Sequence, residues 1–124
     1  MVVLENVINH LLADVSNVNR SKILPSFITN ARSGIAYNIT PLTGGVVKQS
    51  QLEVRVIDPD IDEALSLSSK IEEQLDMTPD KPSISLDGVV LRSQQAGGGS
   101  PMFQDIPQAW EISRYYIITW RCIE

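Results

Sequence analysis

Few residues in this sequence could carry chemistry, and the densest group of them is acidic. It consists of Asp58, Asp60, Asp62 and Glu63, spaced like the start of a calcium loop. An EF-hand loop needs glycine at its sixth position and glutamate at its twelfth, and here those positions hold Glu63 and Ser69. Because Pro59 favours a helix start, where carboxylates complement the free backbone amides, the run predicts a helix N-terminus and not a metal site.

The other reactive residue types occur singly. His10 is the one histidine and is expected on the polar side of a helix, exposed to solvent. Cys122 is the one cysteine, which excludes an internal disulfide, and it is expected on the inward face of a strand as a small apolar side chain. No catalytic, metal-binding or cofactor-binding residue is predicted. A small hydrolase is the weakest alternative, because general acid–base groups are scattered.

Composition limits the remaining classes of function. The 124 residues carry a net charge of −5, with 10 basic and 15 acidic side chains, which argues against gripping nucleic acid by its phosphates. An acidic surface past which DNA slides without sticking stays possible. The start of the chain has no secretory signal, and no apolar run is long enough to cross a membrane. We therefore expect a protein of the cytoplasm.

Apolar spacing predicts an α+β fold in a single domain, residues 1–124. Helical periodicity marks Val2–Val18, and an acidic cap followed by a second stripe marks a helix over Asp60–Asp76. Alternation predicts an antiparallel (mixed) β-sheet of four to five strands, in the order α-β-β-α-β-β-β. The expected strands are Gly34–Thr40, Gln51–Ile57, Val89–Gln95, a short return Pro101–Asp105, and Glu111–Ile123.

Two loops and part of the last strand are candidates for contacts with other proteins. One loop carries Val46, Val47 and Lys48; the other carries Gly97, Gly98, Gly99, Pro101 and Met102. The glycines lack the Lys-Ser/Thr of a phosphate loop and predict a flexible tip, which either orders against a neighbour or is a plain turn. In the last strand, core packing is favoured for Tyr116 and Trp120.

Trp110, Tyr115 and Ile117 are better candidates for an interface. Tyr115 and Ile117 fall on the second face of the last strand, where a solvated sheet would be polar. Their apolar character predicts cover from a helix or from another subunit. Whether residues 42–50 and 94–104 are ordered before assembly is left open.

This layout resembles the tail-terminator and tail-completion proteins of long-tailed bacteriophages (siphoviruses), which are also described as head–tail joining or minor capsid proteins. The resemblance covers most of the chain as a pattern of elements, without a sharp motif. It rests on the N-terminal helix, the strand ending in Pro41, the strand Gln51–Ile57 running into the second helix, and the last strand with Trp110 and Tyr115-Tyr116.

The resemblance implies a virion protein, assembled in the host cytoplasm, that forms a ring of commonly six copies. The ring would sit on the head-proximal end of the tail tube, stop its polymerisation and join tail to head. Its partners would be further copies of itself, the tail-tube protein and the head-connector or neck protein, with DNA passing through the lumen unread. The alternatives are a neck or head-completion protein of the same kind of phage, and a cellular small α+β binding domain.

Overall fold

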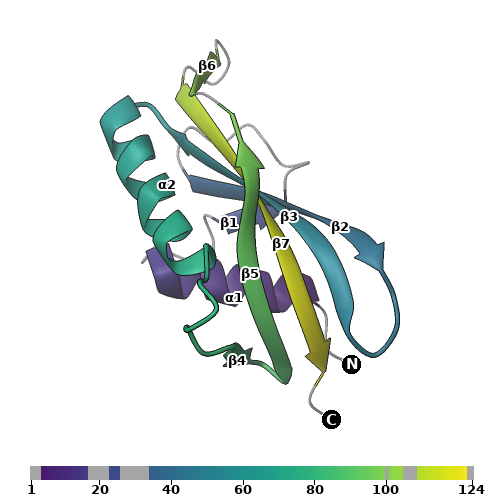
Figure 1. Cartoon of the computed structure of the whole chain (residues 1–124). Coiled ribbons are helices and arrows are strands. Elements are labelled where there is room, and N and C mark those ends of the chain that lie inside the picture. The colour runs from purple at the N-terminus through teal and green to yellow at the C-terminus, as the bar shows by residue number, and fades with distance from the viewer. Residues whose placement is uncertain (1–3, 17–22, 26–33, 100, 105–108, 123–124) are drawn as a thin grey trace.

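The computed structural model describes residues 4–16, 23–25, 34–99, 101–104 and 109–122. Its helices are α1, Leu4–Ser16, and α2, Ile61–Leu75. Its strands are β1 (Ile23–Pro25), β2 (Gly34–Thr43), β3 (Lys48–Asp58), β4 (Ile84–Leu86), β5 (Val89–Gly98), β6 (Met102–Gln104) and β7 (Ala109–Cys122). The predicted α+β class is confirmed, and Figure 1 shows the two helices beside one long, twisted sheet.

The strand count differs from the prediction, because the described part of the sheet holds seven strands in the order β1-β2-β3-β7-β5-β4, with β6 also paired to β7. All neighbours are antiparallel except β1, which runs parallel to β2. The two strands that the sequence does not predict, β1 and β4, are three residues long each, too short to show alternation. The outer ends of the predicted first helix and last strand lie outside the described residues.

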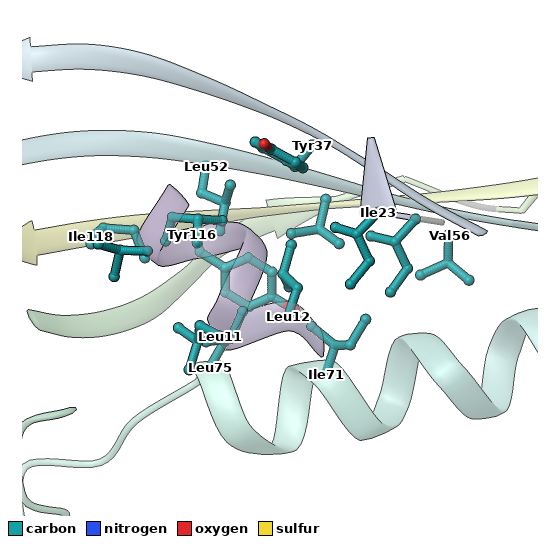
Figure 2. Close-up of a cluster of buried hydrophobic side chains, with 14 of the residues drawn as sticks. Leu11, Leu12, Ile23, Tyr37, Leu52, Val56, Ile71, Leu75, Tyr116 and Ile118 are labelled. Carbon is teal, nitrogen blue, oxygen red and sulfur yellow. The ribbon is translucent and has the colours of Figure 1, made fainter. Parts of the chain in front are cut away.

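Both helices pack on the same face of the sheet. The predicted stripe of α1 is buried, including Ile8 and Leu12 at 0% exposure. In α2 the buried side chains are Ala64, Ser68, Ile71 and Leu75. Figure 2 shows Tyr116 of β7 pointing toward the helices, into the layer where Leu12 and Leu75 lie. This layer is the hydrophobic core of the described part of the chain.

The acidic run begins α2, as predicted. The Asp60 carboxylate accepts a hydrogen bond from the Asp62 amide at 2.9 Å, and Asp62 and Glu63 lie in the first turn. Asp58 accepts in the same way from the Asp60 amide. These bonds satisfy amides that the helix leaves without partners. The run therefore has a structural function at the start of a helix.

Candidate assembly surfaces

The β2–β3 hairpin projects beyond the core, and its turn is shorter than predicted. Strand pairing continues to Thr43 opposite Gln49, so the connection is residues 44–47 and not about ten residues. At its end Val46 is 84% exposed, Val47 54% and Leu42, which the sequence analysis does not single out, 46%. We call these three residues the hairpin surface. They are apolar side chains exposed at the end of a hairpin whose pairing shifts register between Pro41 and Thr43.

Lys48, predicted as part of the same loop, instead begins β3. It pairs with Trp120 of β7, and its Nζ lies 5.1 Å from the centre of the Trp120 ring, within the range of a cation–π contact. The Trp120 indole N–H donates to Ser50 Oγ at 3.2 Å. Lys48 is therefore half-buried at the base of the hairpin surface and stabilises the hairpin against β7.

The triple glycine is not a loop tip, so that prediction is wrong. Gly97 and Gly98 belong to β5 and pair with Tyr115 and Arg114 of β7, and the Gly99 amide donates to Ser113 O at 3.1 Å. Pairing with β7 resumes in β6, from Met102 opposite Glu111. The predicted strand and its short return are thus two strands, β5 and β6, that pair along the same edge of β7, with β5 ending at Gly98.

A cross-strand neighbour explains why glycine occupies position 98. A Cβ atom there would lie 2.5 Å from Cδ of Arg114 and 3.0 Å from the Ser113 carbonyl oxygen. The guanidinium of Arg114 donates to Gly99 O at 2.7 Å, and its Nε lies 3.9 Å from a Glu72 carboxylate oxygen on α2. Gly98 gives Arg114 the space to tie the irregular segment to the sheet.

The opposite end of the sheet carries a second exposed apolar group. Met102 is 62% exposed, and Phe103, which the sequence analysis does not single out, is 50% exposed. The Phe103 ring meets Trp110 edge-to-face, with centroids 5.4 Å apart, and Pro101 precedes them half-buried. We call Met102, Phe103 and Trp110 the β6 surface. Of the predicted interface positions, Met102 and Trp110 belong to this surface, and Pro101 lies at its margin.

Tyr115 and Ile117 lie on the face of the sheet away from both helices. Their partners in β3, Glu53 and Gln51, alternate with the buried Leu52 and Val54. Both side chains are half-buried, and a hydrogen bond to Glu53 raises the pKa of the Tyr115 hydroxyl. The sequence predicts that a helix or another subunit covers this face. Neither described helix does so.

The hairpin and β6 surfaces lie far apart. Lys48 pairs with Trp120 and Asp58 pairs with Trp110, so β3 and β7 run from one surface to the other. Ten residues of strand separate the two tryptophans, which corresponds to about 33 Å at ~3.3 Å per residue. Figure 1 shows the tip of the β2–β3 hairpin and β6 at opposite ends of the sheet. The two surfaces cannot form one site within a single copy.

Charge is absent from both segments that bear these surfaces. Residues 34–47 and 93–104 contain no Asp, Glu, Lys or Arg, although 20% of the chain is charged. Among the residues whose burial the structure describes, five of the six exposed large hydrophobic residues lie in these two segments, the other being Leu65 of α2. The acidic side chains gather instead along α2 and its ends, at Asp58, Asp60, Asp62, Glu63, Glu72, Glu73 and Asp76.

His10 and Cys122 differ from their predictions. The His10 ring lies between two carboxylates, with Nδ1 2.9 Å from Asp87 and Nε2 3.5 Å from Asp14, so it links α1 to the β4–β5 turn and is not simply solvated. Cys122, predicted inward, is exposed at the end of β7. Within the described ranges, no group of three His, Cys, Asp or Glu residues is arranged to hold a metal ion.

Compared with known proteins, the sequence matches no family model and no curated protein. Across the described residues, no helix has the length and apolarity to cross a membrane. The candidate site is therefore defined by geometry alone: two exposed, uncharged, apolar surfaces at opposite ends of one sheet.

Proposed function

We propose that the protein is a structural component of a phage virion that assembles into a ring at the head-proximal end of the tail tube. The ring ends polymerisation of the tube and joins tail to head. The observation that carries the assembly role is the pair of exposed apolar surfaces, with Val46 at 84% and Met102 at 62% exposure, at opposite ends of the sheet. The assignment to a phage tail rests on the likeness in element order.

Two different surfaces on one copy favour a head-to-tail contact. A contact of one surface with the other is heterologous, and repeating it gives a closed ring or an open filament. A self-complementary dimer would need only one surface. The number of copies, commonly six in the proteins that this layout resembles, remains part of the proposal.

The proposed role requires no catalysis. The single histidine is held between Asp14 and Asp87, where it links two structural elements. In the acidic run, the carboxylates of Asp58 and Asp60 cap α2 by accepting hydrogen bonds from backbone amides of the same run. Residue types that could carry chemistry are thus used in support of the fold, which favours an assembly role over a hydrolase.

A neck or head-completion protein of the same kind of phage is the second candidate, since it would use similar surfaces against different partners. A cellular α+β binding domain is the third. Light scattering of the purified protein, alone and with the tail-tube protein of the same virus, separates them. A ring alone, or one that forms on tube ends, supports the terminator. A ring indifferent to tubes supports the neck protein, and a monomer or dimer under both conditions contradicts both.

A further inference from the structure

Parts of the two uncharged segments also form sheet edges beside which the described residues place no neighbouring strand. β1 pairs with β2 only at Ile35–Tyr37, so from Asn38 to Thr43 no described strand covers the outer edge of β2. On the other side, β4 covers Val89–Leu91 of β5, and Met77 and Asp76 bond to the backbone of Ser93 and Gln95. Beyond Gln95, no described element covers the outer edge of β5 or β6.

Exposed strand edges normally carry devices against pairing with other chains, and charged side chains are the commonest of them. These two edges carry no charged side chain, although the pairing shifts register between Pro41 and Thr43 in β2 and between Gln95 and Gly97 in β5. At the overall charged fraction, about five charges would be expected in the combined length of residues 34–47 and 93–104, and there are none. Each edge does contain one proline, Pro41 or Pro101, which interrupts a ladder of hydrogen bonds but is tolerated at an edge.

We propose, resting on the ring assembly above, that neighbouring copies join by strand addition. The outer edge of β2, Asn38–Thr43, pairs with the outer edges of β5 and β6 of the next copy, at Gly97–Gly99 and at Pro101–Met102. The occupant is a second copy because this chain supplies both edges, both are uncharged, and their directions agree. β2 runs antiparallel to β5 within the sheet, so a copy related by rotation places the two edges antiparallel.

The stagger of the two edges fits a closed ring. Asn38–Thr43 lies level with Tyr115–Thr119 of β7, whereas residues 97–102 lie level with Glu111–Tyr115. Joining them shifts each copy along the strands by about four residues, or about 13 Å, across four strands that span about 19 Å. The strands would then tilt by about 35° from the ring axis, at the lower end of the roughly 35–45° of closed β-barrels.

In the register that this stagger gives, Asn38 lies opposite Met102 of the next copy and Pro41 lies opposite Gly99. Asn38 and Met102 are both exposed, and both lie on the sheet face away from the helices. Paired residues of antiparallel strands have Cα atoms about 4.5–5.5 Å apart, which a disulfide can bridge. Within one copy, β3 and β7 lie between the two positions, which are about 14 Å apart across the strands alone. No internal bridge can therefore form.

The test is oxidation of an Asn38→Cys/Met102→Cys variant, with Cys122→Ser to remove the native thiol, under the conditions in which light scattering shows assembly. We expect a ladder of linked copies on non-reducing gels, ending at the ring size and collapsing with reductant. The control, Asn38→Cys/Ser66→Cys, places the second thiol on the exposed outer side of α2 and gives no ladder. Rings that form with no ladder from the first variant overturn strand addition but leave the ring; a chain that stays monomeric with and without tail tubes overturns both.

Discussion

The helix-covered face of the sheet and its two uncharged ends use the same kinds of side chain in opposite ways. On the covered face, Leu12, Leu75 and Tyr116 are fully buried by elements of the same chain. At the ends, Val46 in the β2–β3 turn and Met102 at the start of β6 are exposed to solvent. Charged residues border the first region and are missing from the second. The difference separates apolar residues that fold the chain from those available to join one copy to another.

A core truncation should produce the largest loss of stability. Leu12→Ala removes a side chain with 0% exposure between the helices and the sheet, and we expect a loss of about 2–5 kcal/mol in the free energy of unfolding. Denaturant titration measures it. Val46→Ala removes an aliphatic side chain at 84% exposure and should stay within about 0.5 kcal/mol. Similar losses in both variants would contradict the division into two regions.

A charge on a free edge should affect assembly and spare the fold. Thr40→Lys adds a cation to the exposed edge of β2, and we expect copy–copy affinity to fall about a hundredfold, equivalent to about 2.8 kcal/mol. Analytical ultracentrifugation measures the affinity, with thermal unfolding as the check on the fold. Ser66→Lys, on the exposed side of α2, is the matched control. Equal assembly by the two variants would place the interface elsewhere.

Gly98→Ala should have an intermediate effect on stability. The added Cβ would lie 2.5 Å from Arg114 Cδ, so the arginine must leave its bonds to the Gly99 and Ser113 carbonyls. We expect a loss of about 1–3 kcal/mol, measured by chemical unfolding. Gly44→Ala is the control, because nothing lies within 4 Å of its added Cβ. An unchanged Gly98→Ala would mean that Arg114 is not needed where it lies.

The smallest effect is expected from Tyr116→Phe at neutral pH. The Tyr116 hydroxyl is buried and has no hydrogen-bond partner, so its removal should change stability by less than about 0.5 kcal/mol or increase it slightly. Burial raises the pKa of Tyr116 above its ordinary value of 10.0. Since the folded state then holds a proton that the unfolded state loses, wild-type stability should fall above about pH 10, by at most ~1.4 kcal/mol per pH unit for this group.

Measuring the free energy of unfolding of the wild type and of Tyr116→Phe from pH 8 to 11 tests whether stability falls with rising pH. Tyr115→Phe is the comparison, because the hydrogen bond to Glu53 raises the pKa of Tyr115 as well and contributes to the same decline. The decline should therefore become less steep in Tyr116→Phe without disappearing. A steeper decline in that variant than in wild type would contradict the assignment.

Periodicity predicts the parts of this fold that follow from local spacing. The described part of the α1 stripe, the alternation in β3 and most of that in β7 are confirmed, because each depends only on which side of an element faces the core. The α2 stripe is confirmed at Ala64, Ser68, Ile71 and Leu75 but not at Leu65, which is 39% exposed. The Asp87-Gly88 turn between β4 and β5, with φ of 52° and 81°, has the residue pair of a hairpin turn, a local signal that the expected strands leave out.

The remaining errors depend on neighbours that are distant in the sequence. Three consecutive glycines predict a tip, yet Gly97 and Gly98 lie in a strand because they pair with β7. Position 98 is glycine because Arg114, sixteen residues later, needs the space. His10 is placed between carboxylates by a turn that lies 77 residues away. Of the assembly surfaces, the exposed valines and Met102 were predicted, whereas Leu42 and Phe103 become visible only when the edges of the sheet are known.

The position of β7 has a consequence for synthesis on the ribosome. This strand separates β3 from β5 in the sheet but follows every other described strand in the chain. Until it emerges, β3 and β5 lack their shared neighbour, and Tyr116 is missing from the core. Nascent chains stalled before residue 109 should therefore be digested by protease as unfolded chains, and released chains should resist. The apolar ends would then become available for joining only on a chain whose sheet is complete.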